Sequence, residues 1–310
     1  MSRLRADLLI ILAAVIWGFG YLFQKLAMAN VGPFTFVASR AVVAAACLGL
    51  LAIVEARRAT VPMPPAVRRT ALAAGTAFFI AAAVQQTGMV TATVTNTGFL
   101  TALYVIATPL IAWLVYRRSP NRVVWPAAGL AFAGVWLLGG GGLASLGFGD
   151  ALVALSAIGW SVHLLIFSTA AAHNRPVAFT AWQFAVVAVL AAIPAYILET
   201  PSWEGIVAAA PSILFVGVLS SAFTFTVLAA SLKHTPPSEA AILISTETLF
   251  AAGAGVVFLG ERLPPIGWVG AALMFAATLL VQLGPAFGRR WNGRKGPETP
   301  ESLKNAPGGA

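Results

Sequence analysis

Ten long apolar stretches divide this sequence, and their length decides which class of fold the chain can adopt. Most contain the roughly 20 residues that an α-helix needs to cross a hydrocarbon layer of about 30 Å. Only 9% of the residues are charged, whereas a soluble domain carries roughly 25%. We therefore predict an integral membrane protein with ten spans. The spans cover residues 7–29, 34–54, 70–86, 93–116, 123–140, 150–171, 177–198, 208–231, 239–260 and 266–285.

The spans should be α-helices rather than the strands of a β-barrel. Barrel strands alternate between apolar and polar residues over about ten positions, and these Gly-, Ala- and Leu-rich stretches show no such alternation. Arg3 and Arg5 before an apolar run resemble the start of a secretory signal peptide. However, the apolar run is longer than the roughly 7–15 residues of the apolar region in a signal peptide. We therefore expect the first span to be retained as a helix.

Positive charges gather on one side of the predicted membrane. Sixteen of the nineteen Lys and Arg residues lie before the first span, after the last span or in loops that share that side. The loops on the opposite side contain only Arg262, while Lys25 and Arg40 lie within spans. Because cytoplasmic loops carry an excess of Lys and Arg, both termini are predicted to be cytoplasmic. The net charge of +9 then reflects topology and anionic lipid rather than a nucleic-acid partner.

The sequence repeats itself at a shift of 143 residues. Asp7 then aligns with Asp150, and Trp17 aligns with Trp160. Each half holds five spans, so the second half enters the membrane from the opposite side, as in the inverted repeats of secondary transporters. The predicted fold is an all-α integral membrane protein with ten transmembrane helices in two inverted five-helix repeats. The expected units are residues 1–142, residues 143–288 and a disordered cytoplasmic tail at 289–310.

Several motifs point to a known family. The Trp17-Gly18 pair, the segment 95–101 and Glu247 together resemble the drug/metabolite transporter superfamily, in its EamA-type branch. The resemblance covers nearly all of the predicted spans and implies a carrier of small solutes. Many such carriers export amino acids and related metabolites through the bacterial inner membrane. One departure is that Thr248 stands where the family often has proline, which leaves Pro109 as the predicted site of a helix kink.

Polar and aromatic side chains inside the spans suggest a cavity for that solute. Such groups are expensive in a membrane and usually face a bundle interior, and hydroxyls in span 93–116 follow one helical face. Rings and neutral polar groups suit an amphipathic solute with a flat apolar part. The alternative is that the hydroxyls bond carbonyls of their own helices. The predicted substrate-binding residues are Trp17, Tyr21, Gln24, Phe79, Gln86, Thr97, Thr101, Tyr104, Trp160, His163, Thr224 and Ser245.

Four of the intramembrane groups have competing interpretations. Trp17 and Trp160 lie about 15 Å deep by helical rise, so each indole N–H needs either a ligand or a packing partner. Glu247 and Arg40 are candidates for coupling or charge recognition. The alternatives for Glu247 are that it carries a coupling proton, that it pairs with a base, or that it bonds a neighbouring helix. The alternatives for Arg40 are that it extends to the interface or that it engages a carboxylate.

Two further basic groups, Lys25 and His163, also have a structural interpretation. Lys25 should extend to the outer interface, where its charge meets water. His163 is able to titrate near neutral pH, but a single histidine on an apolar face is commonly a packing residue.

Enzymatic motifs are missing from the sequence. It contains no His-Glu-x-x-His, Gly-x-Ser-x-Gly or phosphate-binding loop, and its single Cys47 allows no internal disulfide. No catalytic residue, metal or cofactor is therefore expected. The expected partners are a small-molecule substrate and membrane lipid, without nucleic acid, in a monomer or homodimer. A proton-coupled exporter of drugs or small carboxylates is the closest alternative, and a membrane-embedded enzyme or receptor is a remote one.

Overall fold

The structure is an all-α bundle. The computed structural model describes residues 1–58, 63–117, 122–138, 147–169, 175–262 and 265–291, and its regular elements within these ranges are all helical. Eight helical segments there are long and apolar enough to cross a membrane, and two shorter apolar helices complete ten spans. The predicted fold class is confirmed, while nearly all of the predicted tail lies outside the described residues.

The first repeat forms five spans from six helices, because its fourth span is broken. Proline opens two of these helices, at a position where its missing N–H leaves no intrahelical bond unmade. The helices are α1 (Arg3–Ala27), α2 (Pro33–Arg58), α3 (Pro65–Met89), α4 (Val94–Thr101), α5 (Tyr104–Tyr116) and α6 (Val124–Leu138).

The second repeat has the same plan with a more segmented third member. That span runs through a π-helical stretch, a rare form that frequently occurs at functional sites. The elements are α7 (Phe148–Thr169), α8 (Pro176–Leu198), α9 (Trp203–Ala208), α10 (Ala210–Leu214), η2 (Phe215–Phe223), α11 (Thr224–Ser231), α12 (Pro237–Ile244), α13 (Glu247–Leu259) and α14 (Pro265–Trp291).

The two broken spans break at equivalent positions. The α4–α5 break includes Leu103, whose N–H bonds the carbonyl three residues back at 3.3 Å. The α12–α13 break includes Thr246, 143 residues later, and its N–H makes the same bond at the same distance. Neither break contains proline, and Pro109 lies inside α5. The break on the fourth span therefore lies upstream of the kink site predicted from Pro109, and the ninth span breaks without the family's proline.

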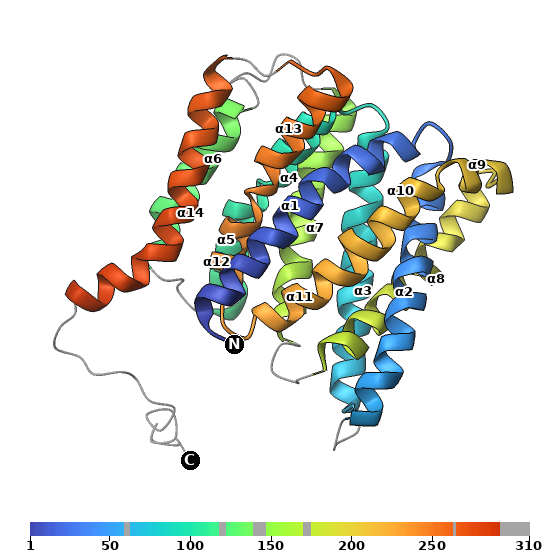
Figure 1. The fold of residues 1–310 in the computed structure, drawn as a ribbon, viewed down its shortest axis with the longest axis horizontal. Helices are drawn as coiled ribbons and strands as arrows, with labels where there is room; N and C mark the ends of the chain where they lie inside the picture. The colour runs from blue at the N-terminus through green and yellow to red at the C-terminus, as the bar shows by residue number, and fades with distance from the viewer. Residues whose placement is uncertain (59–62, 118–121, 139–146, 170–174, 263–264, 292–310) are drawn as a thin grey trace.

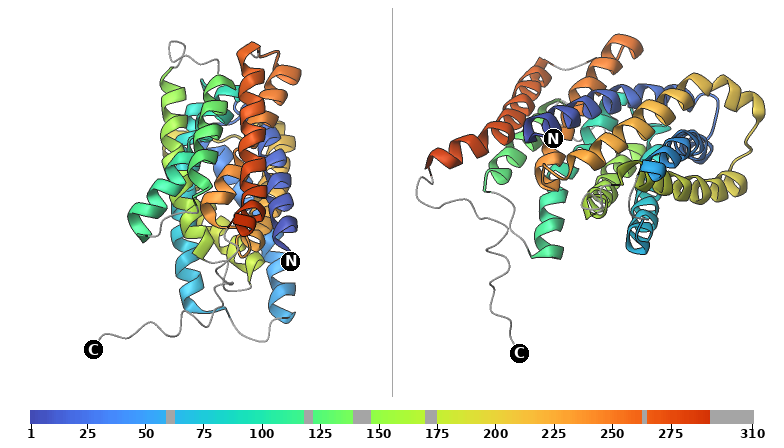
Figure 2. Two further views of the ribbon diagram at one scale, coloured as in Figure 1. Left: turned by 90° about the vertical axis from the view of Figure 1, so that its left-hand side faces the viewer. Right: turned by 60° about the horizontal axis from the view of Figure 1, so that its bottom comes forward.

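The repeats pack as an inverted pair. Figure 1 shows α6 beside α14 at one edge of the bundle and α2 beside α8 at the other, so equivalent helices contact each other across the pseudo-symmetry axis. The left view of Figure 2 shows that most of these helices have their axes roughly aligned with one another. Lys25 near the end of α1 donates to the Met89 carbonyl at 2.9 Å, and Asp150 at the start of α7 accepts from Asn96 Nδ2 at 3.0 Å. Met89 is the last residue of α3 and Asn96 lies in the first turn of α4, so both bonds reach the short connection between these helices. The end of α1 and the start of α7 therefore lie at the same end of the bundle.

Two glutamates cap equivalent helices in a reciprocal arrangement. Glu199, directly after α8, accepts hydrogen bonds from the amides of Phe34 and Thr35 at 2.8 Å each. Glu55 near the end of α2 accepts from the amides of residues 177–178 at 3.2 and 2.9 Å. Each carboxylate satisfies amides that have no partner within their own helix and meets the positive end of the helix dipole. The α2–α8 pair is thus tied together at both ends.

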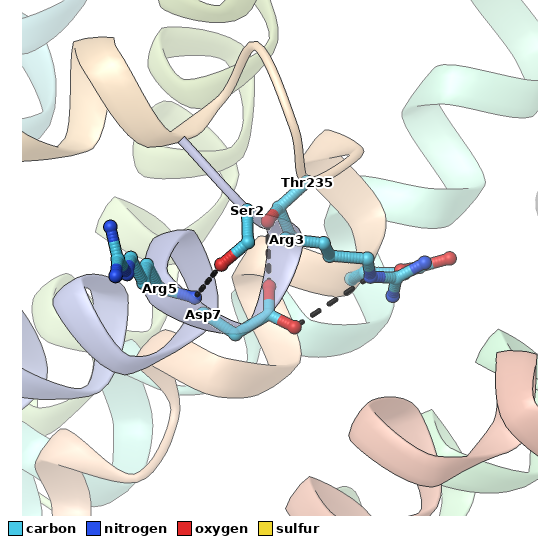
Figure 3. A network of polar contacts seen from close by, with 6 residues as sticks. Ser2, Arg3, Arg5, Asp7 and Thr235 are labelled. Atoms are coloured by element: carbon cyan, nitrogen blue, oxygen red, sulfur yellow. Dashed lines mark hydrogen bonds and ion pairs between the residues drawn. The ribbon is translucent and has the colours of Figure 1, made fainter.

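A polar network joins the start of α1 to the start of α12. Asp7 accepts a hydrogen bond from Thr235 Oγ1 at 2.6 Å and lies 3.6 Å from Arg3 Nε. Arg3 also donates to the Glu239 carboxylate through Nη2. Figure 3 shows Arg3, Asp7 and Thr235 converging at this end of the bundle. The network holds the N-terminal end of α1 against the second repeat.

Candidate functional site

A cavity of about 80 Å³ lies between the two repeats. It has room for roughly six water molecules and is well below the 300–1,000 Å³ of pockets for drug-sized ligands. Among the described residues, α6, α8, α9, α10 and α14 supply none of the lining. The lining consists of Trp17, Tyr21, Gln24, Arg40, Phe78, Gln85, Thr101, Tyr104, Trp160, His163, Leu164, Ser220, Phe225, Leu228, Ile244 and Glu247.

The structure brings most of the predicted site residues together. Seven of the twelve predicted substrate-binding residues line this cavity, as do both predicted charge-recognition residues. They come from α1, α2, the two broken spans and α7, which are far apart in sequence. Their role in binding remains a prediction, but their convergence on one cavity is a property of the fold. The nine residues are Trp17, Tyr21, Gln24, Arg40, Thr101, Tyr104, Trp160, His163 and Glu247.

On α3 the lining face is offset by one residue from the predicted one. Phe78 and Gln85 line the cavity, whereas Phe79 packs against the core and Gln86 is buried beside the sulfur of Met28. Both pairs are seven residues apart, so periodicity predicts a common face for either pair. A helix turns by about 100° per residue, so an offset of one residue places the cavity-lining face of α3 about 100° from the predicted face.

Three of the predicted Thr and Ser hydroxyls lie outside the lining, and each bonds a main-chain carbonyl three or four residues back. Thr97 donates to the Thr93 carbonyl at 2.7 Å, and Thr224 donates to the Ser220 carbonyl at 2.6 Å. Ser245 likewise donates to the carbonyl three residues back at 2.7 Å. These bonds are the alternative that the sequence left open. The fourth predicted Thr or Ser hydroxyl, that of Thr101, does face the cavity, where it accepts from Gln85 Nε2 at 2.6 Å.

An aromatic cluster around Phe78 forms one wall. Its ring meets Trp160 edge-on with centroids 5.0 Å apart, and it meets His163 and Phe225 at 5.3 Å each. His163 Nε2 lies 3.0 Å from Gln183 Oε1, so the histidine is both packed and hydrogen-bonded. Edge-to-face contacts are a preferred geometry of aromatic pairs and contribute about 0.5–1.5 kcal/mol each. Sequence reasoning missed Phe78 and Phe225 because phenylalanine on an apolar helix carries no signal that separates cavity from core.

The two pseudo-symmetric tryptophans differ in the hydrogen bonding of their indole N–H groups. Trp17 Nε1 donates to the main-chain carbonyl of Ser220 at 2.7 Å, within the π-helical stretch η2. Trp160 Nε1 is buried without a hydrogen-bond partner. A buried donor without a partner costs free energy, about 1–3 kcal/mol for a neutral group. The packing interpretation therefore fits Trp17, and the ligand interpretation fits Trp160.

Glu247 begins α13 at the break and is 3% exposed. Its Oε1 accepts hydrogen bonds from the hydroxyls of Tyr21 and Tyr104, both at 3.1 Å. Tyr104 begins α5 at the equivalent break, so the two first residues after the breaks bond each other across the repeats. Of the alternatives that the sequence left open, hydrogen bonding to neighbouring helices is the one this structure contains.

Arg40 is the buried cation of the cavity and is 5% exposed. Its guanidinium lies over the rings of Phe36 and Phe78, 5.8 and 5.4 Å from their centroids. Nε and Nη2 are buried and have no hydrogen-bond partner, and no carboxylate among the described residues forms an ion pair with the group. Neither predicted arrangement, extension to the interface or pairing with a carboxylate, is present.

Lys25 is held at the end of α1 by main-chain oxygens. Its Nζ donates to the carbonyls of Met89, Val90 and Ala92 at 2.9, 3.1 and 2.8 Å. These carbonyls lie at the end of α3 and in the turn before α4, so the lysine joins three spans of the first repeat. These contacts are structural, and the predicted extension of Lys25 to water at the outer interface stays a prediction. Among the described residues, no group of three or more His, Cys, Asp and Glu side chains is arranged to hold a metal ion.

Comparison with known proteins gives consistent matches. The EamA-like transporter family matches residues 4–140 and again residues 147–283. An uncharacterized transporter of Archaeoglobus fulgidus is 29% identical, over 91% of this chain and 87% of its own length. The uncharacterized transporter YwfM of Bacillus subtilis is 29% identical, over 90% of this chain and 94% of its own length.

A partial relative and a solved structure add to these matches. The threonine/homoserine exporter RhtA of Escherichia coli is 28% identical over 55% of this chain and 58% of its own length. One crystal structure matches 94% of this chain over its own full length, with a TM-score of 0.75 at 18% identity, which establishes a shared fold.

Proposed function

This chain belongs to the EamA-like transporter family, and we propose that it exports small amphipathic metabolites, chiefly neutral amino acids, across a bacterial inner membrane by alternating access. The observation that carries the proposal is the cavity between the two inverted repeats, since inverted-repeat transporters bind their solutes at the repeat interface. The family match supports transport itself. The solute and the direction of flux are the parts that we infer.

Cavity size and lining support the amino-acid class. A space of about 80 Å³ suits a solute of a few heavy atoms better than a drug-sized molecule. The Phe78 and Trp160 rings offer an apolar wall, while Gln85, Thr101 and Tyr104 offer neutral hydrogen-bonding groups. The name of the partial relative RhtA, a threonine/homoserine exporter, points to the same class.

Alternating access would use contacts that differ at the two ends of the bundle. The network of Arg3, Asp7 and Glu239 closes the end that charge distribution assigns to the cytoplasm. At the opposite end, Glu261 accepts from the amides of residues 94–95 at 2.9 Å each, which joins the end of α13 to the start of α4. We propose that these two sets of contacts break in turn as one repeat rocks against the other. Both termini are placed in the cytoplasm in this proposal.

Counterflow in proteoliposomes tests the proposal. Purified protein is reconstituted with each of a panel of unlabelled amino acids inside, and uptake of the labelled amino acid is followed against protein-free liposomes. Saturable uptake of at least one neutral amino acid is expected. Uptake at the protein-free level for every amino acid would refute the proposed substrate class. Saturable uptake of a small carboxylate lacking an amino group, without any amino-acid uptake, would establish the alternative function.

A further inference from the structure

We propose that the cavity binds its solute as a zwitterion, with the solute carboxylate held by Arg40 and Trp160 and its ammonium group held by Glu247. The inference rests on the proposed function and adds the residues and charges that would select the solute. It follows from polar atoms that the protein buries without partners.

Arg40 requires an acceptor that the protein does not supply. Arginine keeps its charge in a protein interior, so this buried guanidinium cannot escape its desolvation by losing a proton. The Phe36 and Phe78 rings face it with π-electrons but offer no acceptor in the plane of the N–H groups. Nε and Nη2 remain unpartnered. A carboxylate fits such a planar fork with two parallel hydrogen bonds, and no neutral group does so as well.

Trp160 provides a further donor at the same wall. Its Nε1 is buried and unpartnered, and its ring meets Phe78, the same ring that Arg40 lies over at 5.4 Å. Arg40 belongs to the first repeat and Trp160 to the second, so a carboxylate between them would touch both moving units. Both residues line the same cavity and contact the same ring, so one anionic group of the solute would be the partner of both donors.

Glu247 supplies the opposite charge. Among the described lining residues it is the one carboxylate, and it forms no ion pair with Arg40 within 4.0 Å. Both of its hydrogen bonds reach Oε1, and no described donor reaches Oε2. Gln24 adds a buried carbonyl oxygen, Oε1, without a partner. The cavity therefore contains separated positive and negative groups, and a zwitterion adds a partner for each without adding net charge.

The opposite repeat has neutral residues at the positions equivalent to both charged groups. The 143-residue shift places Gln183 at the position equivalent to Arg40, and Tyr104 at the position equivalent to Glu247. Both equivalents are buried, and both bond a neighbouring side chain, His163 in one case and Glu247 in the other. Neutral residues thus fill these helix positions in the opposite repeat, and for this reason Arg40→Gln is chosen as a test.

The first test uses the wild-type protein and needs no substitution. Competition against counterflow of the best neutral amino acid is measured with three compounds: the same amino acid, its carboxamide and its N-acetyl derivative. The carboxamide removes the anion and the N-acetyl derivative removes the cation. We expect each derivative to compete about 10- to 100-fold more weakly, the loss for a charged hydrogen bond of roughly 1.5–3 kcal/mol.

The second test assigns the charges to residues. Arg40→Gln should lower the apparent affinity for the free amino acid by about 10- to 100-fold. It should also remove the preference for the amino acid over its carboxamide. Glu247→Gln should remove the preference over the N-acetyl derivative instead. Arg40→Lys should restore part of the carboxylate preference, because it keeps the charge without the fork. Arg68→Gln is the matched control, since Arg68 also lies over a ring, that of Trp182, but is exposed and outside the cavity.

The results separate this inference from the proposed function. No amino-acid uptake by the wild-type protein would refute the proposed function. Uptake in which the carboxamide or the N-acetyl derivative competes as well as the free amino acid would leave that function intact and overturn the zwitterion site. Unchanged carboxylate preference in folded Arg40→Gln would overturn the assignment to Arg40. If that variant does not fold, the analogue competition on the wild-type protein still decides whether a zwitterion is bound.

Discussion

Gly18 allows α1 to approach α13 at the level of the cavity. A Cβ atom added at this position would lie 2.5 Å from the Cβ of Phe250 and 2.6 Å from the main-chain oxygen of Glu247. Carbon atoms in ordinary contact are about 3.5–4.0 Å apart, so Gly18→Ala requires the two helices to separate by roughly 1 Å. We expect an overpacking cost of about 1–3 kcal/mol.

Gly49→Ala provides the matched control. Gly49 is also in the interior of a helix, α2, but an added Cβ there meets nothing within 4 Å. Both substitutions gain the same helix propensity, about 1 kcal/mol in water, so this term cancels when the two variants are compared. Gly18→Ala should therefore unfold about 1–3 kcal/mol more easily than Gly49→Ala, with the whole difference due to packing.

Thermal unfolding in detergent, followed by tryptophan fluorescence, measures this difference as a lower apparent Tm for Gly18→Ala. Counterflow in proteoliposomes should also be slower in this variant, because the displaced α13 carries Glu247 away from the hydroxyls of Tyr21 and Tyr104. Gly49→Ala should transport at the wild-type rate. Equal stability of the two variants together with wild-type transport in both would refute the close approach of α1 and α13.

Three further predictions concern single polar groups. Glu199→Ala should destabilise the protein by about 2 kcal/mol in chemical denaturation, because it removes a charged cap that receives three hydrogen bonds, while exposed Glu204→Ala should change little. Counterflow should respond to a transmembrane pH gradient, and Glu247→Gln should abolish this response; equal responses in both proteins would remove the proton-coupling role. Thr101→Val should weaken substrate competition in the uptake assay, whereas Thr97→Val, which alters a bond within one helix, should leave it within about twofold of wild type.

The fold could be predicted from the sequence because it depends on averages over many residues. Apolar length defines each span, and the 143-residue repeat with an odd number of spans per half defines the inverted plan. The helix breaks were harder to predict. Pro109 is the local signal in span 93–116, but it lies within α5, and the ninth span breaks at Ser245 and Thr246 without any proline. Tertiary contacts across the repeats, such as Tyr104 with Glu247, accompany both breaks.

The site could be predicted only in part, for reasons that differ between residue types. Trp160 and Glu247 stand out in the sequence because an indole N–H or a carboxylate at the membrane midplane is costly unless it has a partner or a ligand. Hydroxyls carry a weaker signal, since Thr97 and Thr101 are four residues apart on one helix but only Thr101 reaches the cavity. Which face of α3 lines the cavity depends on how the neighbouring helices pack against it. The sequence of α3 alone does not distinguish the face of Phe78 and Gln85 from that of Phe79 and Gln86.

Pseudo-symmetry separates what the fold needs from what the solute needs. Asp7 and Asp150 are equivalent, and each accepts a hydrogen bond at the start of its repeat, as expected for residues that organise both copies. Within the cavity the equivalence fails, because Arg40 has Gln183 as its counterpart and Glu247 has Tyr104. A symmetric cavity would present the same groups twice and could not orient an asymmetric solute. The differences between the repeats therefore leave Arg40 and Glu247 without charged counterparts, and these differences are where substrate selection should be sought.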